Sequence, residues 1–170
     1  MLISGSGSNL QALIDDPGID VACVVSSRTE APGVGRAQRA GIPVIATADP
    51  DETAGFLEGH GVGLVVLAGY MRILPAEFLD RFPGRVVNVH PSLLPAFPGR
   101  TAIADALAEG VRVTGVTVHI VEEEVDSGPI LMQEAVEVPY DGSAVELERR
   151  IHEVEHRLLP QAVRELGATS

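Results

Sequence analysis

The pattern of hydrophobic and polar positions alternates short apolar runs with amphipathic, helix-like segments. Valine-rich apolar runs lie at residues 21–25, 64–67 and 86–89, and shorter ones at residues 1–3 and 43–45. A continuous apolar run flanked by turn residues is typical of a strand that is buried on both faces, as in a parallel sheet. We therefore predict that these runs form a parallel sheet.

Helical patterns separate the strands. Residues 31–40 and 102–109 read as helices, and each is followed by a glycine, the residue that most often ends a helix. Residues 75–81 read as one or two helical turns that begin with proline. Ser143 opens a long helix, and Glu146 three residues later completes a capping box.

The second half of the chain predicts a different strand arrangement. Residues 111–121 and 130–138 read as two strands that are joined by an acidic loop. The chain is therefore expected to be a single α/β domain, residues 1–170, with one doubly wound, Rossmann-like, mostly parallel sheet. Helices cover both faces, and a strand pair plus a long helix complete the C-terminal side. In such sheets the ligand site lies outside the carboxyl ends of the strands, near a switch point.

Composition and charge narrow the function. The 170 residues carry a formal charge of −12, the opposite of what a general nucleic-acid or anionic-membrane binder needs. All 12 basic residues are arginine, which excludes a P-loop lysine and a Schiff-base lysine. The single Cys23 allows no internal disulfide and suits a reducing cytoplasm.

The most apolar stretch, residues 62–74, is interrupted by Gly69 and Arg72 and is too short to span a bilayer. We expect a soluble, cytoplasmic protein.

A glycine-rich loop follows the first strand. Residues 4–10 read SGSGSNL and open a helix that runs to Ile14. Glycines permit a tight turn, and the backbone N–H groups that follow favour an anion such as a phosphate monoester. Leu10 replaces the third glycine of a dinucleotide fingerprint. The alternative is a plain turn in which Ser8 or Asn9 caps the helix.

The run NVHPSLLP at residues 88–95 offers groups for acyl transfer. Asn88 and His90 stand two apart at the end of a strand and so project from the same face. An amide can donate to a developing oxyanion, and an imidazole can handle protons. The alternative is that the two side chains merely satisfy each other. Asp126, in the acidic loop, is a candidate to orient His90, although composition alone does not choose among the carboxylates there.

Residues 152–156 match the zinc-peptidase pattern H-E-x-x-H, which would place two imidazoles on one helix face. No extended pattern follows it, and we expect no metal. His60 and His119 have no partners nearby in the sequence, so both are expected to be structural.

Taken together, the motifs resemble the phosphoribosylglycinamide formyltransferases, the folate-dependent glycinamide ribonucleotide transformylases of purine synthesis. Four segments carry the resemblance, in the right order over nearly the whole chain: residues 4–10 (SGSGSNL), 67–74 (LAGYMRIL), 88–95 (NVHPSLLP) and 126–129 (DSGP). The resemblance implies that a formyl group passes from 10-formyltetrahydrofolate, as co-substrate, to the amine of glycinamide ribonucleotide.

The resemblance also implies roles for individual residues. A nucleotide-binding half would span about residues 1–85 and a folate and catalytic half about residues 86–170, in a monomer or homodimer that acts on small molecules alone. His90, Asn88 and Asp126 would be catalytic; Gly7, Ser8, Asn9 and Glu155 would bind the nucleotide; and Met71, Arg72, Ile73, Leu74, Asn88, Glu122 and Asp126 would bind the folate.

The sequence also departs from this family. The stretch from Ala46 to Gly63 is shorter than usual and lacks a basic residue often found there, and Arg100-Thr101 replaces a segment that contains histidine in some relatives. Other functions stay open: a formyltetrahydrofolate hydrolase, a methionyl-tRNA formyltransferase, a zinc peptidase, or a non-catalytic nucleotide- or folate-binding module. The chain has no room for the regulatory domain typical of the hydrolases, and its charge disfavours binding of tRNA.

Overall fold

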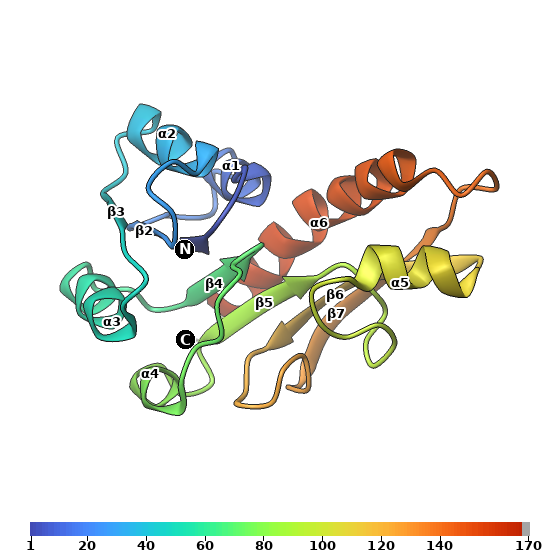
Figure 1. Ribbon diagram of the computed structural model, residues 1–170. Coiled ribbons are helices and arrows are strands. Elements are labelled where there is room, and N and C mark those ends of the chain that lie inside the picture. The colour runs from blue at the N-terminus through green and yellow to red at the C-terminus, as the bar shows by residue number, and fades with distance from the viewer. Residues whose placement is uncertain (168–170) are drawn as a thin grey trace.

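One seven-stranded sheet runs through the computed structural model of the chain, which describes residues 1–167 (Figure 1). The strand order is β3-β2-β1-β4-β5-β6-β7; the first five strands are parallel, and β6 and β7 are antiparallel. This confirms the predicted fold class. The strands are β1 (Leu2–Ile3), β2 (Val24–Ser26), β3 (Val44–Ala46), β4 (Val65–Ala68), β5 (Val86–His90), β6 (Val113–Ile120) and β7 (Ile130–Glu137).

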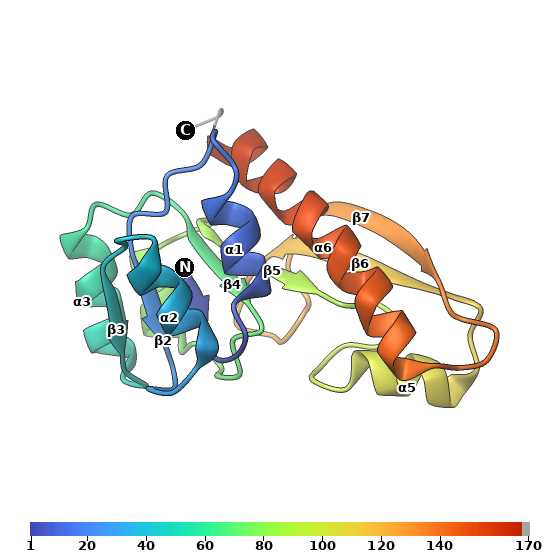
Figure 2. The ribbon, with the colours of Figure 1, turned by 90° about the horizontal axis from the view of Figure 1, so that it is seen from above.

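Helices cover both faces of the sheet. One apolar cluster gathers α1, α2 and α6 on one face, and a second gathers α3 and α4 on the other. Figure 2 shows α6 lying beside α1 along the first face. The helices are α1 (Ser8–Ile14), α2 (Pro32–Arg39), α3 (Pro50–Gly59), α4 (Ala76–Arg81), α5 (Ala102–Glu109) and α6 (Ala144–Gly167). Between residues 1 and 167, none of them combines the length and apolar character needed to cross a membrane.

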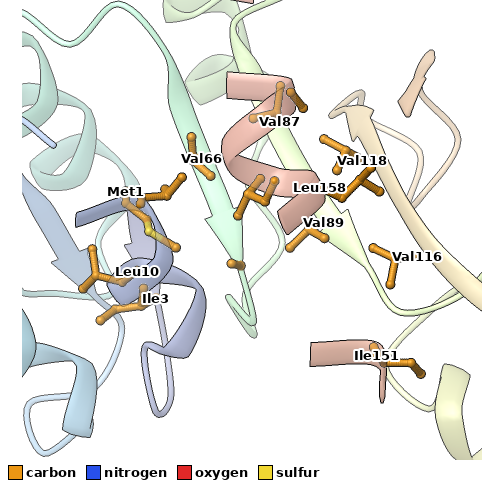
Figure 3. Close-up of a cluster of buried hydrophobic side chains, with 14 of the residues drawn as sticks. Met1, Ile3, Leu10, Val66, Val87, Val89, Val116, Val118, Ile151 and Leu158 are labelled. Carbon is orange, nitrogen blue, oxygen red and sulfur yellow. The ribbon is translucent and has the colours of Figure 1, made fainter. Parts of the chain in front are cut away.

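The larger core lies between the sheet and α6. Val87 and Val89 of β5 and Val116 and Val118 of β6 are buried beside Leu158 of α6 (Figure 3). Burying one such side chain stabilises the fold by about 1.5–3 kcal/mol. Because alternate residues of a strand face opposite sides, this arrangement turns the residues between the valines of β5 away from α6.

The helix α3 was not predicted from the sequence. Its start carries local signals: the Asp49 carboxylate accepts a hydrogen bond from the Glu52 N–H at 2.9 Å, and Pro50 occupies the first helical position. The helix has little amphipathic contrast, and only Thr53, Ala54 and Leu57 are buried. The periodicity of apolar residues is therefore weak where the capping pattern is clear.

Two local predictions need correction. The strand expected at residues 21–25 is shifted towards the C-terminus, since β2 begins at Val24 and ends at Ser26. The capping box at α6 is only half formed: the Glu146 N–H donates to Ser143 Oγ at 3.3 Å, but the Ser143 N–H donates to Asp141 instead. The Glu146 carboxylate pairs with Arg149 and Arg150 on the next turn.

The sheet reverses its winding at β1. From β1 the chain moves outward through β2 to β3, and it returns through α3 to β4 on the other side of β1. Because β1 and β4 are neighbouring strands, the loops that follow them start next to each other and then turn towards opposite faces of the sheet. This is the switch point at which doubly wound sheets bind ligands, as the sequence analysis expected.

The buried hydroxyl of Thr117 in β6 holds the loop that follows β5. It donates to the Ser92 carbonyl at 2.7 Å and accepts from the Leu94 N–H at 3.1 Å and from Gln133 Nε2 at 2.9 Å. Thr114, on the opposite face of the same strand, is also buried, but its hydroxyl has no hydrogen-bond partner in the described part of the chain.

These two threonines form a matched pair for a stability experiment. Thr117→Val removes three hydrogen bonds, including one to an otherwise buried N–H, and should lower the free energy of unfolding by about 1–3 kcal/mol. Thr114→Val replaces an unpartnered hydroxyl with a methyl group and should leave stability unchanged or raise it. Denaturant unfolding monitored by circular dichroism measures both. An equal loss in the two variants would contradict the role given to Thr117.

Candidate active site

A cavity of about 410 Å³ opens at the switch point. The glycine loop, the loop after β4, the end of β5, the acidic loop after β6 and the middle of α6 all line it. Segments far apart in the sequence thus share one cavity. Every site residue expected from the sequence lies on its wall: Gly7, Ser8, Asn9, Met71, Arg72, Ile73, Leu74, Asn88, His90, Glu122, Asp126 and Glu155.

Asn88 and His90 project from the same face of β5, as predicted, because Val87 and Val89 face the core against α6. His90 is 4% exposed. Its Nε2 lies 2.8 Å from the Phe97 carbonyl, and because a carbonyl oxygen only accepts, Nε2 carries the proton. Its Nδ1 lies 3.4 Å from Asp126 Oδ2. A second proton, on Nδ1, would therefore face a carboxylate.

Asp126 is the carboxylate of the acidic loop that reaches this histidine. Its Oδ2 also accepts from the Gly99 N–H at 2.8 Å, and its Oδ1 lies 3.6 Å from His119 Nε2. Burial acts to raise the pKa of Asp126, but the hydrogen bonds from His119 and Gly99 and the charge of His90 outweigh it. The pKa lies below its ordinary value, so the group is a carboxylate at neutral pH.

His119 was expected to be structural, and the structure corrects this. It lines the cavity, and its Nε2 lies 3.3 Å from Asn88 Nδ2 and 3.6 Å from Asp126. Its Nδ1 donates to the Ile120 carbonyl at 2.9 Å, and its Nε2 faces both the Asn88 amide and the Asp126 carboxylate. The antiparallel register pairs Asn88 with His119 across β5 and β6. That register is the signal that would have found it, and a single sequence does not show it.

The glycine loop brings the start of α1 to the other end of the cavity. Gly7 has φ 71°, and a Cβ built there would lie 2.7 Å from the Gly33 Cα, so the close approach of α1 and α2 requires glycine. Helix α1 begins at Ser8 with no side-chain cap. The alternative in which Ser8 or Asn9 caps the helix is therefore wrong. Asn9 instead extends towards α6.

Asn9 and Glu155 form a buried pair between α1 and α6. The Asn9 Nδ2 donates to Glu155 Oε2 at 2.9 Å, while the Asn9 Oδ1 is buried without a hydrogen-bond partner in the described residues. Glu155 is 6% exposed. Burial raises its pKa, and the Asn9 hydrogen bond and the nearby His152 oppose that rise without cancelling it. A buried carboxylate with so few partners on a cavity wall is typical of a binding residue.

The loop after β4 forms the apolar wall. Met71 is 51% and Ile73 70% exposed, whereas Leu74 is buried beneath them. The Met71 N–H donates to the Ser4 hydroxyl at 2.9 Å, so this loop is tied to the start of the glycine loop. Glu122 of the acidic loop lines the cavity and is exposed.

The residues of the zinc-peptidase pattern, 152–156, lie on α6 and are not arranged as a zinc site. The rings of His152 and His156 stack on one side of α6 with centroids 6.0 Å apart. Glu155, between them in the sequence, bonds to Asn9. Across residues 1–167, no three histidine, cysteine or acidic side chains are grouped so as to hold a metal ion.

Comparison with known proteins identifies the family. Residues 1–163 match the family described as Formyl transferase. Phosphoribosylglycinamide formyltransferase of Bacillus subtilis is 37% identical over 177 residues, which cover 96% of this chain and 91% of that protein. The Mycobacterium tuberculosis protein of the same name is 44% identical over 182 residues, covering 98% of this chain and 83% of that protein.

Other relatives are larger or have solved structures. The trifunctional purine biosynthetic protein adenosine-3 of Gallus gallus is 43% identical, but this chain spans only 18% of its length. The crystal structure of glycinamide ribonucleotide transformylase 1 from Symbiobacterium toebii matches with a TM-score of 0.92 and 46% identity, covering 96% of this chain and 84% of that one. With the matched fold, these similarities show that the chain belongs to the formyl transferase family, among the phosphoribosylglycinamide formyltransferases.

Proposed function

We propose that the chain transfers a formyl group from 10-formyltetrahydrofolate to the amine of glycinamide ribonucleotide, a step of purine synthesis. The observation that carries this proposal is the convergence of Asn88, His90 and Asp126 in one cavity whose far end holds the glycine loop and Glu155. A binding module has no need of a buried histidine paired with a carboxylate. The names of the relatives support the same reaction.

The nucleotide is proposed to bind at the glycine-loop end. The N–H groups of Gly7, Ser8 and Asn9 suit the phosphate, because the chain has no lysine to hold it. Glu155 suits the ribose hydroxyls, which can donate to a carboxylate. The unpartnered Oδ1 of Asn9 supports this location, since a buried acceptor without a partner is rare and a bound ligand would satisfy it.

The folate is proposed to bind at the other end, against the apolar wall of Met71, Ile73 and Leu74 together with Arg72. Its pterin would lie by the acidic loop, near Glu122 and Asp126, with Asn88 between the pterin and the reacting carbon. The division of the chain near residue 85 is then only approximate. The apolar wall belongs to the first half, whereas Glu155 reaches the nucleotide from the second.

The chemistry is proposed to proceed by direct attack of the substrate amine on the formyl carbon. Negative charge develops on the formyl oxygen, and the second Nδ2 proton of Asn88 and the protonated His90 stabilise it. The carbon–nitrogen bond to the folate then breaks as the carbonyl re-forms, and His90 gives its proton to the leaving nitrogen. The attacking nitrogen, positively charged after its attack, returns a proton to His90. Asp126, charged and 3.4 Å from Nδ1, provides a negative charge beside His90 throughout.

Both ring nitrogens of His90 are engaged in the structure, which adds a requirement to this mechanism. The hydrogen bond from Nε2 to the Phe97 carbonyl has to be exchanged for one to the substrate. The Phe97 carbonyl belongs to the loop between β5 and α5. We further propose that the protein works in the cytoplasm, as a monomer or homodimer.

A transfer assay on metal-free protein tests the function. Tetrahydrofolate and formylated nucleotide should form together, and only when 10-formyltetrahydrofolate and glycinamide ribonucleotide are both present. His90→Ala and Asp126→Ala should each lower kcat by about 10²-fold or more, because each removes a proton donor or its counter-charge. His60→Ala, at an exposed histidine outside the cavity, is the control. Tetrahydrofolate formed without the nucleotide would instead indicate a hydrolase, and near-normal activity of either variant would refute its assigned role.

Glu155→Gln tests the buried carboxylate on two measures. The KM for the nucleotide should rise about tenfold, because a charged acceptor is replaced by a neutral one. The same substitution should weaken substrate binding but raise the stability of the folded protein at neutral pH. The folded pKa of Glu155 lies above the unfolded value, so the folded state holds its proton more tightly and wild-type stability falls as pH rises through that window.

The Gln variant has no such titration, so its stability advantage over the wild type should grow as the pH rises above about 4.5 and then level off. Thermal unfolding between pH 4 and pH 8 measures this difference. An advantage that shrinks with rising pH would contradict the raised pKa of Glu155, and an unchanged KM would show that Glu155 does not bind the nucleotide.

A further inference from the structure

Two arginines on the cavity wall have no acidic partner. Arg72 and Arg100 are both exposed, and neither has a carboxylate within 4.0 Å among residues 1–167. Both guanidinium groups line the cavity of a chain whose formal charge is −12. Several arginines elsewhere pair with aspartate or glutamate: Arg81, Arg149, Arg150, Arg157 and Arg164.

Arg100 reaches across the cavity from the loop between β5 and α5. Its Nη2 donates to the Met71 carbonyl at 2.7 Å, which places the guanidinium against the loop that carries Arg72. The other N–H groups of Arg100 make no hydrogen bond within residues 1–167. A guanidinium has five N–H donors in a planar fork that matches a carboxylate, so most of this recognition capacity is unused.

Exposed apolar side chains line the same cavity as Arg100. Met71, Ile73 and Val125 line the cavity, and each is more than half exposed, at 51%, 70% and 53%. Side chains of this kind rarely stand exposed in a group unless something binds there. Exposed apolar surface beside an unpaired guanidinium fits a ligand segment with an aromatic ring and a carboxylate attached to it. Glu122 and Glu123 also line the cavity and would repel that carboxylate, so a nearby cation is needed to hold it.

We propose that Arg100 binds a carboxylate of the glutamate tail of the formylfolate. This inference rests on the proposed function, because a folate ends in a p-aminobenzoyl ring followed by one or more glutamates. The ring packs on Met71 and Ile73, and the fork of Arg100 receives the carboxylate while one N–H keeps the Met71 carbonyl. Arg100 therefore sets the preference of the protein for folates with an anionic tail.

Two formyl donors separate this role from a purely structural one. The first is 10-formyltetrahydrofolate, and the second is 10-formyltetrahydropteroate, which has the same ring system but no glutamate. Arg100→Gln should raise the KM for the first donor about tenfold, which corresponds to one charge-assisted hydrogen bond, and leave kcat within about twofold. With the second donor the KM should not change.

Arg112→Gln is the matched control, because Arg112 is exposed, stacks on Tyr140 and does not line the cavity. It should change neither KM. In the wild type, the difference in KM between the two donors should also shrink from low salt to high salt, because exposed charges are screened. A rise in KM of equal size for both donors would overturn the proposal and show that Arg100 only positions the loop at Met71. No change for either donor would overturn it as well.

Equilibrium binding separates this inference from the proposed function. Folic acid should bind the wild type more tightly than pteroic acid, and Arg100→Gln should remove the difference. If that result holds but no formyl group is transferred, the proposed reaction fails and the role of Arg100 stands. If transfer occurs but the two ligands bind the wild type equally well, the role of Arg100 fails and the reaction stands.

Discussion

The buried carboxylate of Asp126 joins three parts of the site that are distant in the sequence. It accepts the Gly99 N–H from the loop after β5, lies 3.4 Å from His90 of β5 and lies 3.6 Å from His119 of β6. These contacts overcome the cost of burying the charge and keep the pKa of Asp126 low. Because two imidazoles and a loop depend on this one group, the acidic loop has to fold back over the sheet before the site exists.

The rest of the site uses the alternation of a strand. Val87 and Val89 fix β5 against α6 (Figure 3), and the same packing holds Asn88 and His90, which alternate with them along the strand. Side chains on a packed strand are positioned more rigidly than side chains on a loop. Much of the remaining cavity wall, in contrast, comes from loops at the switch point, where residues can vary without disturbing the core.

Much of this arrangement could be predicted from the sequence. The valine-rich runs predicted the buried strands, and the spacing of Asn88 and His90 predicted that both side chains lie on the same face of β5. The helix 102–109 was predicted with the bounds observed for α5. These features depend on local periodicity or on a residue two positions away, which a single chain records directly.

What escaped prediction depends on contacts between distant segments. His119 stands opposite Asn88 only because of the register between two antiparallel strands, and Arg100 reaches Met71 only because two loops meet at the switch point. The pairing of Asn9 with Glu155 spans 146 positions. No periodicity in the sequence encodes contacts between such distant segments. The resemblance to a family indicated Asn9 and Glu155 as site residues but did not show that they touch.

The helix α6 closes the larger core and also brings Glu155 to the cavity. It is the last element of the fold to be synthesised, and its partner α1 is among the first. A nascent chain that has not yet reached residue 144 therefore lacks both the helix that covers this face of the sheet and the part of the cavity wall that Glu155 forms. The cavity is therefore complete only when α6 has been synthesised and packs against α1.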